Sequence, residues 1–112
     1  MVPLVWGYTV LDLAERFGLE AVIVGRAGLG TLNHILMTAA MLRARNIPIR
    51  GVVLNGRKDP LDLAESTNPA ALARMLPGMT IIEVPRRSTA TIQETILSII
   101  PLISPLLKHA RA

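Results

Sequence analysis

Apolar residues gather in short runs that are separated by longer segments with a helical repeat. The runs span residues 2–5, 19–25, 49–55 and 80–84. Three of the runs are rich in valine and isoleucine with little polar alternation, which is typical of strands buried on both faces. The intervening segments predict helices over residues 9–17, 32–45, 68–76 and 90–108. Strands and helices that alternate at this spacing predict an α/β fold, a parallel sheet built from βαβ units.

Local signals indicate where the helices begin and end. Thr31 is suited to cap the helix over 32–45, and Asn68 followed by Pro69 is suited to start the helix over 68–76. Pro101 and Pro105 interrupt the last helix, whose end is therefore uncertain. Residues 56–67 form the longest predicted loop, long enough to carry function.

The composition predicts one modest domain without covalent cross-links. The chain has 112 residues, of which 51% are hydrophobic and 3% aromatic, so the core must be aliphatic. It has no cysteine, which excludes disulfides, thiolate metal sites and a cysteine nucleophile. So much aliphatic surface in a small domain indicates burial against something else, and hence a fragment or an obligate partner.

The net charge of +4 comes from scattered basic pairs rather than from one run. Because no aromatic residues interleave with these charges as a stacking surface would require, nucleic acid is an unlikely partner. The start of the chain has no signal peptide, and the most apolar stretch, ILSIIPLISPLL, is too short to span a bilayer. We therefore expect a soluble, cytoplasmic protein without a membrane partner.

The stretch VGRAGLGTLNH follows the second predicted strand and opens a helix. Its glycine spacing imitates a phosphate-binding loop, but no lysine precedes Thr31 to contact phosphates. A helix N-terminus nevertheless suits an anion, and Asn33 adds an amide donor. The residues favour a carboxylate over a phosphate, while a plain strand-to-helix turn remains the alternative.

Two further strand ends carry polar residues. Asn55 ends the third predicted strand, and its amide has the donor and acceptor that the edge of adenine requires. It precedes Gly56, and this dipeptide is also a common turn. Arg86 and Arg87 follow Pro85 after the fourth strand, where they contact either a nucleotide or water. Ligands of open parallel sheets bind beyond the carboxyl ends of the strands, which would bring all three segments to one edge.

These motifs together resemble a known family. GLGTLNH, followed about twenty residues later by GVVLN, and then NPAALARML and IIEVPR, closely resemble the carboxyl-terminal half of dethiobiotin synthase over residues 2–87. The resemblance implies an ATP-dependent, magnesium-requiring, dimeric ligase of biotin biosynthesis. It would close a ureido ring on 7,8-diaminopelargonate with CO2.

The resemblance also implies roles for particular residues. Those that would bind the carboxylate of the substrate are Leu29, Gly30, Thr31 and Asn33. Those that would bind adenine are Asn55, Gly56, Pro85, Arg86 and Arg87. The residues themselves contain no credible metal site or catalytic triad, and we expect no catalytic residue on this chain.

The family's P-loop, catalytic lysine and magnesium ligands belong to an amino-terminal half that residues 1–112 do not match. We therefore expect a single α/β domain, or half-domain, that lacks the P-loop portion and is inactive by itself. It would act with a separate P-loop-containing chain or as a homo-oligomer. The alternative is a non-catalytic remnant or self-associating interaction module.

Overall fold

The computed structural model describes residues 2–86 and 91–108 of the chain. Its central element is a parallel sheet in the order β3-β4-β5. The three strands are β3 (Ala21–Arg26), β4 (Ile49–Arg57) and β5 (Ile81–Pro85). Both pairings are parallel, with Val24 opposite Val53 and Val53 opposite Ile82. The predicted α/β fold with parallel βαβ units is thus confirmed, with three strands instead of four.

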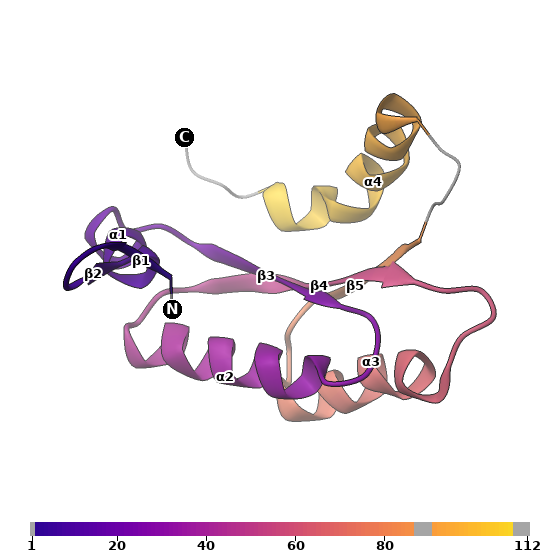
Figure 1. Cartoon of the computed structure of the whole chain (residues 1–112), viewed down its shortest axis with the longest axis horizontal. Helices are drawn as coiled ribbons and strands as arrows, with labels where there is room; N and C mark the ends of the chain where they lie inside the picture. The colour runs from indigo at the N-terminus through magenta and orange to yellow at the C-terminus, as the bar shows by residue number, and fades with distance from the viewer. Residues whose placement is uncertain (1, 87–90, 109–112) are drawn as a thin grey trace.

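Helices cover the two faces of this sheet unequally. Helices α2 (Thr31–Ala44) and α3 (Leu63–Met75) connect successive strands and lie on one face, as Figure 1 shows. Helix α4 (Ile92–Leu107) follows β5 and lies on the opposite face. The α2/α3 face holds the larger apolar cluster, which includes Ile35, Val52, Leu54 and Leu72. A smaller cluster under α4 consists of Val53, Ile82, Val84 and Leu106.

The first apolar run does not join the parallel sheet, which corrects the prediction of a fourth parallel strand. Its residues form β1 (Pro3–Val5), an exposed strand that pairs antiparallel with β2 (Tyr8–Thr9). Gly7 has a φ of 76°, which glycine adopts without strain, and it turns the chain back on itself. Helix α1 (Val10–Arg16) then begins with a capping box between Thr9 and Asp12.

Helix α3 begins earlier than the sequence predicts. Asp62 is its N-cap and forms a capping box with Glu65, so Asn68 and Pro69 lie inside the helix. The predicted start at Asn68 is wrong because two acceptable start signals lie six residues apart (Asp62 and Asn68), and the earlier one forms. Since β4 also continues to Arg57, the predicted loop over 56–67 is much shorter.

Helix α4 continues through both of its prolines, which the sequence predicts as interruptions. A proline has no N–H, so Pro105 leaves the carbonyl of Pro101 without its usual donor. The hydroxyl of Ser104 donates to that carbonyl at 3.1 Å. Leu97, whose carbonyl loses its donor at Pro101, is mostly exposed, so water reaches this part of the helix.

Candidate functional site

The carboxyl ends of the three parallel strands bring the predicted site segments to one edge of the sheet. The backbone N–H of Ala27 donates to the carbonyl of Asn55 at 2.9 Å, immediately after β3. The N–H of Arg86 donates to the carbonyl of Arg57 at 2.7 Å. The segments that follow β3 and β5 are therefore each hydrogen-bonded to the carboxyl end of β4.

The glycine loop after β3 ends in a helix without a side-chain cap. Gly30 is the N-cap of α2, with a φ of 88°, and Thr31 is the first helical residue. The prediction of Thr31 as the cap is wrong because the left-handed turn at Gly30 starts the helix one residue earlier. Leu29 and Asn33 are exposed beside this N-terminus. The first amides of α2 thus have no side-chain acceptor from their own N-cap.

The side chain of Thr31 points away from the exposed part of the loop. Thr31 is only 2% exposed, and its Oγ1 is the buried side-chain oxygen that lacks a partner among residues 2–86 and 91–108. It lies against Gly25 and lines a cavity of about 200 Å³ together with Arg26 and His34. This cavity lies along β3. Among the described strands, β3 pairs only with β4.

Two buried polar residues of α3 contact the loops of this edge. Asn68 donates from Nδ2 to the carbonyl of Ala27 at 2.8 Å and to that of Gly28 at 3.1 Å. Glu65 accepts from the backbone N–H of Lys58 at 3.3 Å. Sequence reasoning missed both contacts. The capping-box spacing of Asp62 and Glu65 was the signal that could have located the helix start and hence the inward face.

The structure brings four of the five predicted nucleotide residues together. Asn55, Gly56, Pro85 and Arg86 line one cavity of about 250 Å³. Gly56 has a φ of 83° and lies within β4 at the register shift between Asn55 and Arg57, where this left-handed backbone favours glycine. The fifth predicted residue, Arg87, lies outside the described residues.

Helix α4 supplies the other side of this cavity. Thr95, Ser98 and Leu102 line it, and sequence reasoning missed them. Their spacing of three and four residues places them on one helix face, which was the available signal. The hydroxyl of Thr95 donates to the carbonyl of Thr91 at 2.9 Å, and that of Ser98 to the carbonyl of Thr95 at 2.8 Å. Each hydroxyl keeps lone pairs that can still accept from a ligand.

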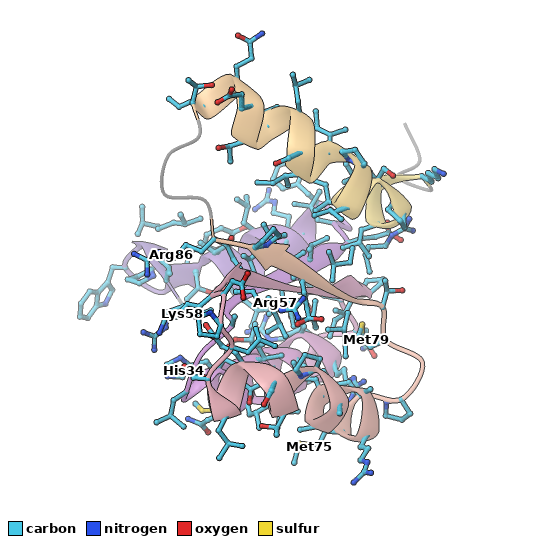
Figure 2. The ribbon with its side chains drawn as sticks, turned by 90° about the vertical axis from the view of Figure 1, so that its right-hand side faces the viewer. His34, Arg57, Lys58, Met75, Met79 and Arg86 are labelled. Carbon is cyan, nitrogen blue, oxygen red and sulfur yellow. The ribbon has the colours of Figure 1, made fainter. Side chains whose placement is uncertain are left out.

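Basic side chains lie at the same edge. Figure 2 shows His34, Lys58 and Arg86 toward one side, at the end of the sheet away from Met75 and Met79. Arg57 is partly neutralised by Glu83, with an Nε–Oε1 distance of 3.5 Å. Lys58 pairs weakly with Asp62 at 3.8 Å. The edge therefore combines helix-terminal amides with positive side chains, an arrangement that favours anions.

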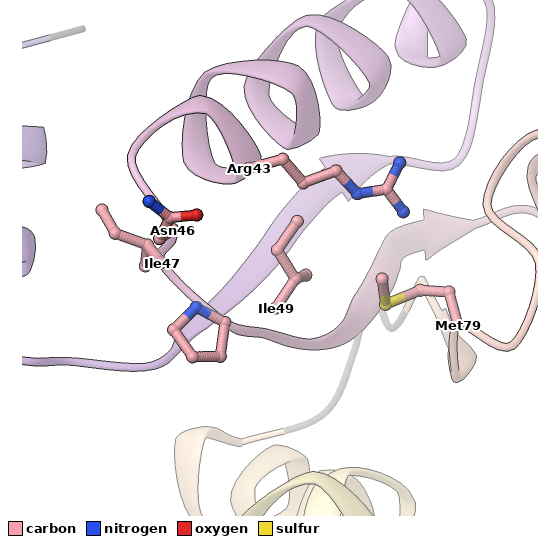
Figure 3. A pocket seen from close by; sticks show the side chains of 6 residues that line it. Arg43, Asn46, Ile47, Ile49 and Met79 are labelled. Atoms are coloured by element: carbon pink, nitrogen blue, oxygen red, sulfur yellow. The ribbon is translucent and has the colours of Figure 1, made fainter.

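A larger hollow lies at the other end of the strands. It has a volume of about 410 Å³ and is lined by Arg43, Asn46, Ile47, Pro48, Ile49 and Met79 (Figure 3). None of the predicted site residues belongs to it. Among the described residues that line it, Arg43 alone is charged, so this hollow offers less chemistry than the carboxyl edge.

The comparison with known proteins agrees with the resemblance carried by GLGTLNH and GVVLN. Residues 1–109 match a family model described as an AAA domain. The chain belongs to the AAA domain family. This P-loop family assignment and the observed parallel sheet support the same fold class.

The chain also matches part of several curated enzymes named ATP-dependent dethiobiotin synthetase. The protein of Paramagnetospirillum magneticum is 55% identical over 60 residues, which cover 54% of this chain and 29% of that protein. The protein of Aquifex aeolicus is 40% identical over 85 residues, or 76% of this chain and 38% of that protein. The protein of Bacillus subtilis is 33% identical over 99 residues, or 88% and 42%. The matched part spans less than half the length of each of these relatives.

No cluster of three or more His, Asp or Glu residues that could hold a metal ion occurs within residues 2–86 and 91–108. No helix in that part of the chain is both long and apolar enough to cross a membrane.

Proposed function

We propose that this chain supplies the carboxyl-terminal part of an ATP-dependent dethiobiotin synthetase. The whole enzyme would close the ureido ring on 7,8-diaminopelargonate with CO2, using ATP and Mg²⁺. The observation that carries this proposal is the meeting of two predicted subsites at one edge of a sheet whose sequence matches those enzymes. The chain's role is binding and orientation rather than phosphoryl transfer.

The proposed nucleotide subsite is the cavity of Asn55, Gly56, Pro85 and Arg86. Asn55 is exposed at the end of β4, where its amide can donate to and accept from a base edge. The hydroxyl oxygens of Thr95 and Ser98 offer further acceptors from the facing helix. Arg87 is proposed to extend this subsite from the sequence resemblance alone.

The proposed carboxylate subsite is the N-terminus of α2. Leu29, Gly30 and Thr31 would contribute backbone amides, and Asn33 its side-chain amide. The lack of a side-chain cap at Gly30 supports this role, because an external acceptor can satisfy the first amides of the helix. The other described helices, α1, α3 and α4, each begin with a capping box. In each of them a side chain of the N-cap already accepts from a backbone N–H of the first turn, where α2 leaves that place to an external anion.

The chain is proposed to work with a P-loop portion that binds along β3. Val22 and Val24 of this strand are 38% and 65% exposed, although the corresponding face of β4 is covered by α4. The unpartnered Oγ1 of Thr31 lies beside the same strand. A partner strand along β3 would pair with its free backbone edge, and a partner helix packed over the α4-side face of β3 would bury these valines. The same arrangement would bring the phosphate-binding and magnesium-binding residues of the partner portion to the carboxyl edge.

The direct test mixes this chain with the amino-terminal portion of the Paramagnetospirillum magneticum enzyme that precedes the matched segment. We expect ADP release that requires ATP, Mg²⁺ and 7,8-diaminopelargonate, and we expect none from either part alone. No turnover from a mixture in which both parts are folded and associated would refute the proposal.

Arg86→Ala and Arg43→Ala form a matched pair for this assay. Both arginines are exposed, but Arg86 lines the proposed nucleotide subsite and Arg43 lies at the opposite end of the strands. Arg86→Ala should raise the KM for ATP about threefold to tenfold, since it removes one charged contact. Arg43→Ala should leave the KM unchanged, and equal effects of the two variants would contradict the subsite.

A second candidate function is a self-associating module without catalysis. It is favoured by an apolar hollow of about 600 Å³ between α1 and α2, lined in part by Val10, Met37 and Met41. Under this candidate, the chain forms oligomers by itself, and neither ATP nor 7,8-diaminopelargonate raises its melting temperature. A ligand-induced rise would exclude it.

A further inference from the structure

Helix α3 carries two of the three buried polar residues that the described part of the chain contains, Glu65 at 2% and Asn68 at 5% exposure. Burying an amide or a carboxylate is costly unless its polar atoms are hydrogen-bonded. Both residues find partners in backbone groups of the loops that form the candidate site. Their burial thus links the start of α3 to the geometry of those loops.

Asn68 contacts the glycine loop in a defined orientation. Its two partners, the carbonyls of Ala27 and Gly28, can only accept, so the NH₂ group of the side chain must face them. One side chain therefore fixes two consecutive peptide groups. The contact spans 41 residues of sequence and is buried, which makes it a tertiary constraint rather than a local turn.

The planarity of the peptide bond carries this constraint to the donors of the loop. In a trans peptide the carbonyl and the following N–H point in opposite directions. Since the carbonyls of Ala27 and Gly28 face Asn68, the N–H groups of Gly28 and Leu29 point away from it. Those amides directly precede the uncapped N-terminus of α2 at Gly30.

Glu65 offers a natural comparison within the same helix. It is buried one turn before Asn68, but it holds the backbone N–H of Lys58, in the segment after β4. It also accepts from the N–H of Asp62 at 3.2 Å as part of the capping box. The two residues thus support different loops at similar burial.

We propose that Asn68 is a positioning residue for carboxylate binding, because it fixes the peptide groups of Ala27 and Gly28 and thereby aims the amides of the glycine loop. This inference rests on the proposed carboxylate subsite at the N-terminus of α2. Asn68 does not touch the ligand. It lowers the cost of ordering the loop when the anion binds.

The test compares Asn68→Leu with Glu65→Gln in the isolated, ¹⁵N-labelled chain. Leucine has a shape close to that of asparagine but donates no hydrogen bond. We expect the backbone order parameters of Gly28 to Gly30 to fall from about 0.85 toward 0.6 in Asn68→Leu. Glu65→Gln should instead change the backbone order parameter of Lys58 and leave Gly28 to Gly30 ordered. Unchanged order at Gly28 to Gly30 in Asn68→Leu overturns the inference.

A second measurement titrates each folded variant with 7,8-diaminopelargonate and, separately, with ATP. The loss of two hydrogen bonds should weaken diamine binding by Asn68→Leu about tenfold and leave ATP binding unchanged. A merely structural role would weaken both ligands or neither, and either result overturns the inference. If the wild-type chain binds no diamine although Gly28 to Gly30 are ordered, the carboxylate subsite itself is wrong.

Asn68→Ser keeps the experiment decisive should Asn68→Leu fail to fold. Serine is smaller and retains one donor, so it can satisfy one of the two carbonyls directly or through water. We expect a smaller loss of loop order and a smaller loss of diamine affinity than for leucine. A folded serine variant with wild-type loop order and wild-type diamine affinity overturns the inference.

Discussion

The two faces of the parallel sheet differ in how completely they are packed. On the α2/α3 face, residues from both helices and two strands are almost inaccessible to solvent, with Leu72 and Val52 at 0% and Ile35 at 1% exposure. On the α4 face, Leu106 is the only fully buried residue of the helix. Ile92, Ile96 and Ile100 of α4 remain at least half exposed, as does Val24 of β3.

This difference indicates which face of the sheet the chain packs completely by itself. The α2/α3 face is a continuous core of aliphatic side chains and should account for most of the free energy of folding, since stabilisation scales with buried apolar area. The α4 face has apolar surface left over, which is the usual mark of an interaction site. The candidate site lies where loops from both faces meet.

The sharpest test of the comparison is Leu72→Ala on the α2/α3 face, which is the completely packed one. Leu72 is fully buried between α3 and the sheet, so its truncation leaves a cavity. We expect the free energy of unfolding to fall by about 2–5 kcal/mol in urea titrations followed by circular dichroism. Met75→Ala, at a 55% exposed position of the same helix, serves as the control and should change it by about 0.5 kcal/mol or less. Similar losses in the two variants would contradict the assignment of the core.

Gly51→Ala tests how firmly α4 rests on its face. A Cβ at Gly51 would lie 2.5 Å from Cδ2 of Leu106 and 2.8 Å from the backbone oxygen of Thr80. We expect a loss of about 1–3 kcal/mol in the free energy of unfolding and faster hydrogen exchange in α4. Gly28→Ala is the matched control, because its Cβ would meet no atom within 4 Å. Unchanged exchange in α4 would show that the contact with Leu106 is loose.

Substitution of Asp12 tests an ion-pair cluster at the margin of the α2/α3 face. Hydrogen bonds from Thr9, followed by the Arg45 side chain, lower the pKa of Asp12 from 3.8 to about 2. A lowered carboxyl pKa stabilises the fold above its unfolded value, and this contribution is lost as the pH falls through the folded value. The melting temperature of Asp12→Asn should therefore lie below that of the wild type at neutral pH. The gap should close between about pH 4 and pH 2, and a gap that stays constant over that range would exclude the carboxylate as its cause.

The smallest effect is expected for Ile100→Lys on the α4 face, which is incompletely packed. Ile100 is 51% exposed, so a lysine there should change the free energy of unfolding of the isolated chain by no more than about 0.5 kcal/mol. The neighbouring Ile99 packs against the cluster under α4. The same substitution at Ile99 should lower the free energy of unfolding clearly more. If Ile100→Lys unfolds the chain, the α4 face is more complete than its exposure indicates.

Sequence patterns were sufficient for the parts of the fold that depend on near neighbours. The apolar runs around Val24, Val53 and Ile82 have the continuous character of parallel strands, and they form the parallel sheet. The meeting of the glycine loop with Asn55 followed from that prediction alone, because parallel strands bring their carboxyl ends to one edge. The similarity to dethiobiotin synthetases was likewise readable from GLGTLNH and GVVLN, and it is confirmed for part of those enzymes.

Other features depend on competition between local solutions that are all acceptable. Asp62 and Asn68 are both good N-caps, and Pro69 suits a first helical position. The structure uses Asp62, and Asn68 becomes a buried donor to a loop 41 residues away. No local pattern could predict this, because the contact depends on how α3 packs against the end of β3. Thr31 shows the same limit, since its hydroxyl is buried against Gly25 rather than used as a cap.

By itself, then, the sequence determined the parallel βαβ order, the place of the glycine loop between a strand and a helix, and the residues offered at the ends of the strands. Those features arise from backbone preferences and apolar periodicity, which act over a few residues. Only the tertiary structure decided that β1 leaves the sheet, that α4 completes the cavity beside Asn55, and that Asn68 holds the glycine loop. These outcomes depend on which apolar faces pack together and, for Asn68, on which buried polar groups find partners, and burial is a property of the packed chain as a whole.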